Sequence, residues 1–411
     1  MKSFRFVSLF LLAAVLGLFV TIAQPARAQI LTTLYSFAGG AAGQYPTGNL
    51  AIDGQGNLYG TTFYGGWISK WRPFGYGMVF KLAPNGDETV LHNFLHYPDG
   101  RYPYAGLITD AEGNLYGTTY YGGTGWCHGP RLGCGTVFEV TASGTEKLLY
   151  SFQNFPDGKN PMANLIMDGQ GNLYGTTVHG GIYTRNCRSG SRRSSSFTCG
   201  TVFEVTPTGS EKVLYRFAGP PDGFSPSESL TMDAQGNLYG TTFEGGTNDV
   251  GTVFKLTPAG AETVLHSFCS ESGCADGARP GSLVLDAQGN LYGGTSVGGA
   301  YGNGTVFELT PDGTLTVLYN FTGGVGGSGP GSLIIDLQGG FYGITGGGGA
   351  YGYGTVFELT PAGIETVLYN FTGGADGGGP RGLIMDAQGN LYGTTGAGGA
   401  YGYGTVFKLI P

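Results

Sequence analysis

The sequence has 411 residues, of which 81 are Gly and only 12% are charged, and its formal net charge is −8. Aromatic residues make up 13% of the chain. They supply enough apolar area to form a core, which argues against a disordered protein. No Gly-X-Y period is present, which excludes collagen.

The first 28 residues have the pattern of a signal peptide. Lys2 and Arg5 give a positive start, residues 6–23 are uncharged and largely apolar, and Ala26-Arg27-Ala28 form an A-x-A cleavage site. We expect cleavage after Ala28 and a secreted, periplasmic or cell-surface protein. An uncleaved membrane anchor is the alternative, because 18 apolar residues are just long enough to span a bilayer.

The mature chain, residues 29–411, is more acidic than the full sequence. Cleavage removes three of the 20 basic residues and none of the 28 acidic ones, which gives a net charge of −11. This balance argues against a nucleic-acid partner. No other segment is apolar enough to cross a bilayer, so we expect no membrane association after cleavage and a monomer.

Residues 29–411 form a tandem array with a period of about fifty residues. A first anchor, L-Y-G or F-Y-G, begins at Leu58, Leu115, Leu173, Leu238, Leu291, Phe341 and Leu391. A second, G-T-V-F or G-M-V-F, begins at Gly77, Gly135, Gly200, Gly251, Gly304, Gly354 and Gly404. A third, strand-like anchor ends at Phe94, Phe152, Phe217, Phe268, Phe321 and Phe371.

Each unit predicts four short antiparallel strands, which we call A to D from first to last. Runs of four to seven residues rich in Val, Ile, Phe, Tyr and Thr alternate with Gly, Pro and Asp. No window shows a sustained helical period. Seven such units predict an all-β, seven-bladed β-propeller that forms a single domain.

The seventh copy of the third anchor stands at the other end of the chain. No such strand follows Gly404, whereas Leu31–Phe37 precedes the first full unit. We therefore predict that Leu31–Phe37 is the outer strand D of the last blade and closes the ring. An open solenoid is the alternative, but it needs capping units, and the sequence shows none.

The compound pattern D-x-x-G-N-L-Y-G-T-T-x-x-G-G, followed by G-T-V-F-x-L-T-P-x-G, resembles the GloVer tandem repeat of bacterial exported proteins. The resemblance covers nearly all of residues 30–411. It implies exported or surface proteins with differing C-terminal anchors, and it implies no activity. This sequence departs from the pattern because it ends inside its last repeat, so we expect no such anchor. More loosely, the strand order resembles NHL-type and lyase-type propellers.

The turns predict one constant and one variable face of the ring. The A–B turns, such as D-A-Q-G-N at Asp233, and the C–D turns, such as T-P-A-G, keep one length throughout. We interpret their Asp and Gly as turn residues; a ring of calcium-binding carboxylates is the alternative. The B–C and D–A connections share the other side and vary in length, as binding loops on rigid scaffolds do.

The variable connections contain all three Trp residues and much of the positive charge of an acidic protein. Exposed Trp beside Arg suits stacking on sugar rings and pairing with carboxylate or sulfate groups. We therefore predict a site for a polysaccharide or a surface protein, with self-packed loops and solvated charge as the alternative. The candidate residues are Trp67, Trp71, Arg72, Trp126, Arg131, His179, Arg185, Arg192 and Arg193.

All six cysteines fall in these connections, with one pair in each of three loops. Confinement to one loop, in an exported protein, predicts the pairs Cys127–Cys134, Cys187–Cys199 and Cys269–Cys274. A zinc site is disfavoured because the C-x-x-C spacing is missing and only His128 lies beside a cysteine. We expect no metal and no cofactor.

Signals for catalysis are weak. The D–A motif D-G-x-x-P repeats at Asp99, Asp157, Asp222, Asp276 and Asp376. These carboxylates could form an acid–base or cation site at the channel mouth, but a turn followed by Pro explains them in every repeat. His179 is the candidate base if the protein is an enzyme. A propeller lyase or hydrolase, and a purely structural surface protein, remain the alternatives to a binding module.

Overall fold

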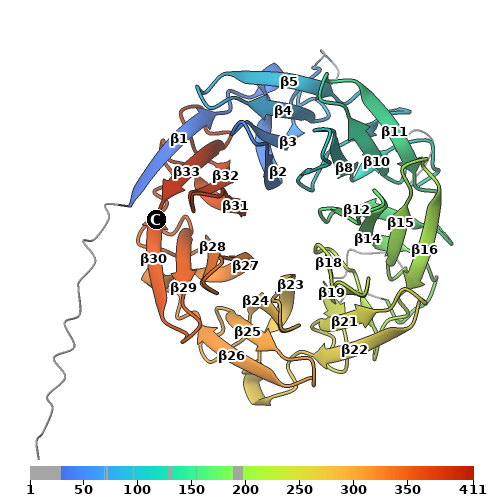
Figure 1. Ribbon diagram of the computed structural model, residues 1–411, viewed down its shortest axis with the longest axis vertical. Helices are drawn as coiled ribbons and strands as arrows, with labels where there is room; N and C mark the ends of the chain where they lie inside the picture. Colours follow the sequence, from blue (N-terminus) through green and yellow to red (C-terminus); the bar gives the residue numbers. More distant parts are fainter. Residues whose placement is uncertain are drawn as a thin grey trace, which may run out of the picture.

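The strands are arranged as blades of a ring around a central channel (Figure 1). The computed structural model describes residues 29–68, 70, 73–95, 97–127, 132–153, 155–187 and 198–411. Within these residues, seven blade sheets follow one another around the axis, each with its strands antiparallel. Helix is confined there to three short 3₁₀ turns, η1 (Gly40–Ala42), η2 (Ser272–Cys274) and η3 (Gly324–Gly326). The predicted seven-bladed β-propeller is confirmed.

Blades 1, 5, 6 and 7 each have four continuous strands, which run in order from the innermost strand A to the outermost strand D. Blade 1 contains β2 (Gln44–Ile52), β3 (Leu58–Tyr64), β4 (Met78–Leu82) and β5 (Glu88–Asn93). Blade 5 contains β23 (Ala278–Leu285), β24 (Leu291–Val297), β25 (Thr305–Leu309) and β26 (Leu315–Asn320). Blade 6 contains β27 (Ser328–Ile335), β28 (Phe341–Gly347), β29 (Thr355–Leu359) and β30 (Glu365–Asn370). Blade 7 contains β31 (Gly378–Met385), β32 (Leu391–Ala397), β33 (Thr405–Ile410) and β1 (Ile30–Ser36).

In blades 2, 3 and 4 strand A is interrupted and forms two short pieces. Blade 2 contains β6 (Gly100–Arg101) and β7 (Ile108–Thr109), β8 (Leu115–Thr119) with its extension β9 (Tyr121–Gly122), β10 (Thr136–Val140) and β11 (Glu146–Ser151). Blade 3 contains β12 (Gly158–Pro161) and β13 (Ile166–Met167), β14 (Leu173–Gly180), β15 (Thr201–Val205) and β16 (Glu211–Arg216). Blade 4 contains β17 (Gly223–Phe224) and β18 (Thr231–Met232), β19 (Leu238–Thr242) with its extension β20 (Glu244–Gly245), β21 (Thr252–Leu256) and β22 (Glu262–Ser267).

The ring is closed by the two ends of the chain, as predicted. Strand β1 pairs antiparallel with β33, in a register that joins Ile30 to Ile410 and Ser36 to Thr405. The Phe37 N–H continues the ladder by donating to the Gly404 carbonyl at 3.0 Å. Figure 1 shows β1 lying along the outside of β33. An antiparallel ladder of this length removes the exposed edge that β33 would otherwise present.

The interior between blades is built from one repeated pair of Phe rings. The last Phe of each strand D region meets the G-T-V-F Phe of the next blade in an edge-to-face contact, with ring centroids 5.0–5.2 Å apart. Edge-to-face pairs of buried aromatic rings stabilise beyond the area they bury. In blade 3, for example, Phe203 packs on Phe152 of blade 2, and both side chains are fully buried.

The Gly of each L-Y-G or F-Y-G anchor gives this Phe ring its space. Gly175 lies opposite Phe203 in the β14–β15 register. A Cβ at Gly175 would lie 2.7 Å from Phe203 Cζ and 2.9 Å from Leu165 Cδ2, closer than real Cβ contacts allow. The same clash arises at the equivalent Gly of the other six blades. The anchor Gly is therefore a packing requirement of the sheet, not a turn residue.

The residue before each strand A Pro fastens one blade to the next. Five of these residues are not Gly, yet their φ values lie between 55° and 59°, in the left-handed region that side chains disfavour: Tyr45, Tyr102, Asn160, Ser225 and Arg279. Each donates its backbone N–H to a carbonyl of the preceding blade's B–C connection at 2.7–2.9 Å, as Arg279 does to Val250. The bond between blades maintains the strained conformation.

The A–B turns use their Asp as a hydrogen-bond acceptor. In blade 3, Asp168 Oδ1 accepts from the Asn172 N–H at 2.9 Å, and Oδ2 accepts from the Asn172 side chain at 2.9 Å and from the Tyr174 hydroxyl at 3.0 Å. Burial opposes ionisation, but these donors outweigh it and hold the pKa of Asp168 below its usual value. The D-x-x-G-N-L-Y motif is thus a closed turn, and its carboxylate oxygens already have donors.

Candidate functional site

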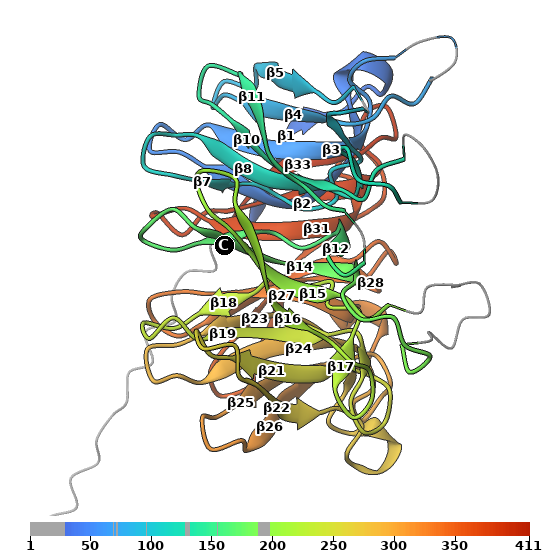
Figure 2. The same ribbon diagram turned by 90° about the vertical axis from the view of Figure 1, so that its right-hand side faces the viewer.

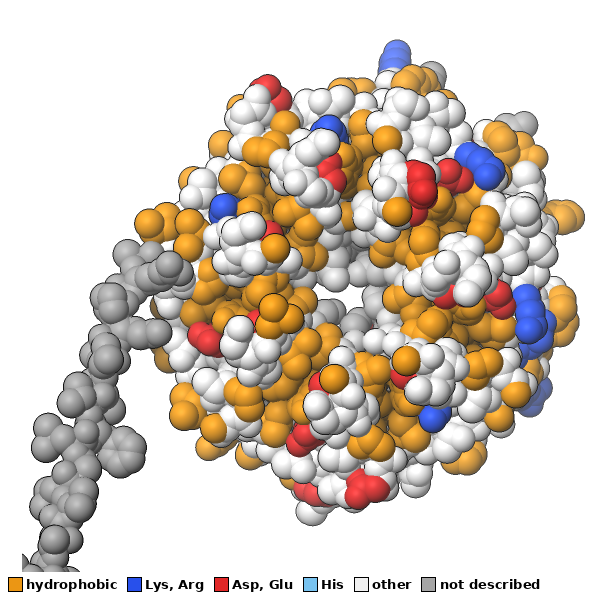
Figure 3. Space-filling model, in the orientation of Figure 1, with side chains coloured by type: hydrophobic (Ala, Val, Ile, Leu, Met, Phe, Trp, Pro, Cys, Tyr) orange, Lys and Arg blue, Asp and Glu red, His pale blue; other side chains and the backbone are white. Residues whose placement is uncertain are grey.

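The B–C and D–A connections lie on one side of the ring and the A–B and C–D turns on the other (Figure 2). We call the first surface the loop face and the second the turn face. Cavities occur on both. On the turn face, grooves of about 690 Å³ and 360 Å³ follow the blade 4–5 and blade 3–4 boundaries, and Figure 3 shows apolar side chains at the bottom of such grooves. Repeat-motif residues line them, and Asp168, Asp233 and Asp286 are already bonded within their turns. We therefore place the candidate site on the loop face.

Four of the nine predicted site residues lie in the described part of the chain. Trp67 and Trp126 are 51% and 73% exposed in the B–C connections of blades 1 and 2. Arg185 is exposed in the B–C connection of blade 3, whereas His179 is half-buried in β14. The remaining five predicted residues lie outside the described residues: Trp71, Arg72, Arg131, Arg192 and Arg193.

Sequence reasoning missed a second set of exposed aromatic residues on the loop face. The B–C connections of blades 5, 6 and 7 share the sequence G-G-A-Y-G. Their tyrosines Tyr301, Tyr351 and Tyr401 are 61–62% exposed. Blade 3 adds Tyr183, 64% exposed, and blade 1 adds Phe74. The signal was present in the repeat, because a Tyr between Ala and Gly in a short loop has no large neighbouring side chain in the sequence to cover it.

The G-A-Y-G turns are fixed from below by strand D. The Ala300 N–H donates to Asn320 Oδ1 at 2.8 Å, and the Ala350 N–H donates to Asn370 Oδ1 at 2.7 Å. In blade 7 the Ala400 N–H donates to Ser36 Oγ at 3.3 Å, across the closing strand β1. Each tyrosine thus projects from a short turn with a defined backbone, which lowers the entropy lost when a ligand binds.

The three predicted disulfides are confirmed: Cys127–Cys134 and Cys187–Cys199 in B–C connections, and Cys269–Cys274 in a D–A connection. The first two link the ends of long loops beside the start of strand C. Both pairs are buried and belong to the hydrophobic clusters between blades. The sulfur atoms therefore connect the variable loops to the rigid ring.

Two further cavities could hold a small ligand. One of about 350 Å³ is lined by His179, Phe243, Glu244 and Ser225. Another, of about 370 Å³, is lined by the innermost strands of blades 4 to 7 and includes Glu228, Arg279 and Arg381. Glu228 accepts a hydrogen bond from the Ser282 hydroxyl at 2.9 Å, and burial raises its pKa. The second cavity combines a carboxyl group with two guanidinium groups. These residues are not part of the repeated motif, so this combination is specific to one side of the channel.

The D-G-x-x-P carboxylates lie toward the outer rim, next to strand D, and not at the channel mouth. Asp157 Oδ2 accepts from the Tyr150 hydroxyl of β11 at 2.9 Å and from the Gln153 N–H at 2.8 Å. Its Oδ1 accepts from the Gly158 N–H at 2.5 Å. The turn interpretation of the motif is confirmed, because the same bonds recur at Asp222.

Three of these aspartates, Asp99, Asp157 and Asp222, face a Glu from the next blade. At the last two junctions the Glu makes the stability of the fold depend on pH. Burial, and then the charge of Asp157, raise the pKa of Glu211 to about 7, and burial and Asp222 do the same for Glu262. Because the folded-state pKa exceeds that of the unfolded chain, the folded state binds more protons between about pH 4.5 and pH 7. Stability is therefore lost as pH rises through 7.

We expect Glu211→Gln combined with Glu262→Gln to stabilise the protein above pH 7, by about 1 kcal/mol per site because the groups are half-exposed. Melting temperatures between pH 5.5 and pH 8.5 should fall more steeply for the native sequence than for the double variant. Glu112→Gln, at an exposed A–B turn position, is the control and should leave the slope unchanged. Equal slopes for all three proteins would contradict the assignment.

Comparison with solved structures finds similar proteins at low sequence identity. The extracellular domain assigned to a hybrid two-component system of B. thetaiotaomicron has a TM-score of 0.55 at 12% identity, over 93% of this chain and 41% of that chain. A gluconolactonase from Xanthomonas campestris has a TM-score of 0.46 at 14% identity, over 92% of this chain and 88% of its own.

Comparison with curated protein sequences gives no match. Among the described residues, no helix has both the length and the apolar composition needed to cross a membrane. A family model described as the Gloeobacter/Verrucomicrobia repeat matches residues 17–189 and 186–407. These two matches span nearly all of the repeat array with its L-Y-G and G-T-V-F anchors, and the chain belongs to the Gloeobacter/Verrucomicrobia repeat family.

Proposed function

We propose that the protein is an exported binding module that holds a polysaccharide on its loop face. One observation carries the proposal: the described B–C connections of six blades each expose an aromatic side chain on the same face. These residues are Trp67 and Phe74, Trp126, Tyr183, Tyr301, Tyr351 and Tyr401. Large aromatic groups left exposed on one face of a stable protein mark interaction surfaces.

A repeating ligand fits this arrangement better than a small one. The aromatic groups are distributed around the ring on six of its blades, and none of them lines the cavities described above. A polysaccharide offers many equivalent sugar rings, and simultaneous weak contacts along one chain multiply into useful affinity. The exposed cations Lys70 and Arg185 on the same face favour a polymer with carboxylate or sulfate groups.

Export is part of the proposal. The N-terminal sequence has the charge and apolar pattern of a signal peptide. The three disulfides in the loop-face connections form and persist in oxidising compartments. Cell fractionation of a tagged protein tests this part, since retention in the cytoplasm with the N-terminus intact would contradict it.

A glycan array followed by calorimetry on the mature protein tests the binding function. We expect the triple variant Tyr301→Ala, Tyr351→Ala, Tyr401→Ala to bind a positive glycan at least 10-fold more weakly, because each central aromatic contact contributes over about 1 kcal/mol. The pair Trp67→Ala, Trp126→Ala should weaken binding similarly. The control Leu337→Ala, Ile364→Ala removes exposed apolar side chains from the turn face, where they are 100% and 63% exposed, and should have no effect.

If neither loop-face variant changes the affinity, the ligand binds elsewhere and the proposal is wrong. An array without any positive glycan, together with capture of a purified surface protein that depends on the same residues, would assign the face to a protein partner instead.

The cavity of about 370 Å³ between the innermost strands of blades 4 to 7 supports a second candidate, an enzyme acting on an anionic sugar. Glu228 lies there with Arg279 and Arg381. A carboxyl group whose pKa is raised by burial is suited to act as a general acid, and the guanidinium groups can pair with an anionic substrate. Incubation of glycans with the native protein and with Glu228→Gln separates the two functions. A product formed by the first protein and not by the second would favour catalysis.

A further inference from the structure

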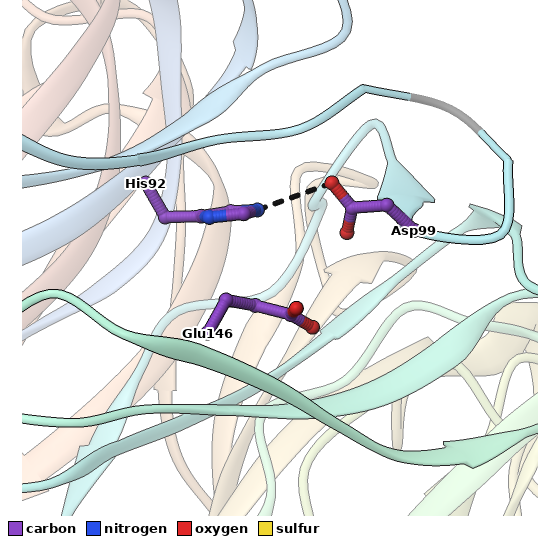
Figure 4. A group of neighbouring side chains, drawn as sticks. All are labelled: His92, Asp99 and Glu146. Carbon is purple, nitrogen blue, oxygen red and sulfur yellow. Dashed lines mark hydrogen bonds and ion pairs between the residues drawn. The ribbon is translucent and has the colours of Figure 1, made fainter.

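Each of the five D–A connections that contain an Asp brings side chains together at the outer rim of the ring. They are a Tyr or His of strand D and the Asp of the connection, joined at the junctions of blades 1–2, 2–3 and 3–4 by the Glu that begins strand D of the next blade. At the junction of blades 1 and 2 these are His92, Asp99 and Glu146 (Figure 4). His92 Nε2 lies 3.1 Å from Asp99 Oδ2, and one ligand atom from each of the three residues lies within 4.8 Å of the others.

We propose that His92, Asp99 and Glu146 bind a divalent transition-metal ion, with Zn²⁺ as the best fit. One imidazole and two carboxylates are Zn²⁺ ligands, and three protein ligands leave a fourth position for water or an oxygen atom of a ligand. Bonds of about 2.0–2.2 Å place tetrahedral ligand atoms about 3.3 Å apart. The His92–Asp99 distance already matches this value, and a short movement of the flexible Glu146 side chain completes the set.

The surroundings hold the Asp99 carboxylate in place for this role. Asp99 Oδ2 also accepts from the Leu95 N–H at 2.9 Å, and Oδ1 accepts from the Gly100 N–H at 2.6 Å. The His92 and Asp99 side chains are only 16% and 14% exposed. Backbone donors that orient a carboxylate, in a site mostly shielded from water, are typical supports of metal ligands.

The buried carboxylate of Glu146 supports the metal site independently of the His92–Asp99 geometry. Its Oε1 is buried and has no hydrogen-bond partner among the described residues, and its carboxylate points toward the His92–Asp99 pair (Figure 4). A bound cation would satisfy an oxygen whose burial otherwise costs free energy. The equivalent oxygens of Glu88, Glu211, Glu262 and Glu365 are in the same condition, so Glu146 alone does not select this junction.

The other junctions show what selects it. Between blades 2 and 3, and between blades 3 and 4, Tyr150 and Tyr215 replace the His, and a protonated phenol is a poor Zn²⁺ ligand. Between blades 4 and 5 the His is present, and His266 Nε2 lies 3.0 Å from Asp276 Oδ2. There, however, Leu315 stands where the Glu should be. Among the described residues, the blade 1–2 junction is the one cluster with His, Asp and Glu ligands together.

The residues at the equivalent positions of the other blade junctions suggest substitutions that preserve the fold. We expect the mature protein, freed of metal by chelation, to bind one Zn²⁺ per chain at micromolar concentration or below in equilibrium dialysis. His92→Tyr recreates the chemistry of the blade 2–3 junction and should weaken this binding at least 100-fold without lowering the melting temperature of the metal-free protein. Glu146→Leu should weaken it at least 10-fold.

Leu315→Glu completes the ligand set at the blade 4–5 junction, so this variant should bind two Zn²⁺ ions. The proposal is overturned if the native protein binds no Zn²⁺, or if His92→Tyr binds it as tightly as the native protein. A single ion bound by Leu315→Glu would show that this ligand set is insufficient and would equally overturn it. These readouts do not depend on glycan binding, so the metal site and the proposed function can fail separately.

Discussion

Removal of residues 30–37 is expected to destroy the folded state of the ring. The segment provides the whole of β1 and the fully buried Phe37, whose ring packs edge-to-face on Phe80 of blade 1 at 5.2 Å. Loss of a buried Phe alone costs about 3–5 kcal/mol. With the β1–β33 ladder lost as well, the total approaches the 5–15 kcal/mol that typically stabilises a domain.

The truncated chain, residues 38–411, should therefore aggregate or unfold well below the melting temperature of residues 29–411, because β33 becomes an exposed edge. A circular permutant distinguishes ring closure from simple loss of residues. Ile30 pairs with Ile410, so a short linker can join the two ends, and new termini can be placed at the exposed C–D turn 142–143. The permutant should fold and keep its melting temperature, whereas a stable 38–411 protein would disprove the closure role.

The second large effect is expected at the Phe rings between blades. Phe203→Ala should cost about 3–5 kcal/mol, because Phe203 is fully buried and makes the edge-to-face contact with Phe152. Gly175→Ala should cost about 1–3 kcal/mol by overpacking, since its new methyl group would lie 2.7 Å from the Phe203 ring. Chemical denaturation of each purified variant gives both values.

The two changes should be strongly non-additive. In the Phe203→Ala background the ring that opposes the methyl group is gone, so Gly175→Ala should then cost about 0–1 kcal/mol, with Leu165 as the remaining close neighbour. Gly169→Ala is the matched control, because nothing lies within 4 Å of a Cβ there and four other blades carry Ala at this A–B turn position. If the two free-energy costs are additive, Gly175 is required for the backbone conformation of β14 and not for the packing of Phe203.

Features that repeat along the chain could be predicted from the sequence. The strands, the number of blades and closure by Leu31–Phe37 follow from three anchors and one displaced copy, because short strands with apolar faces can be covered only by neighbouring blades. The disulfide pairs follow from their confinement to single loops. The candidate loop face follows in the same way, since the A–B and C–D turns keep one length while the other connections vary. Local patterns are sufficient for these conclusions.

The tertiary structure alone decided how each motif residue is used. The anchor Gly is required by a Phe ring on the neighbouring strand, and Tyr45 or Arg279 takes a left-handed φ because its N–H reaches a carbonyl of another blade. The sequence placed Trp67 and Trp126 on the loop face but overlooked Tyr301, Tyr351 and Tyr401. It also gave no sign that His92 lies beside Asp99 and Glu146. Which side chains are exposed, and which lie close together, depends on contacts between segments about fifty residues apart in the sequence. For that reason the partners of these side chains become visible only when the blades stand side by side.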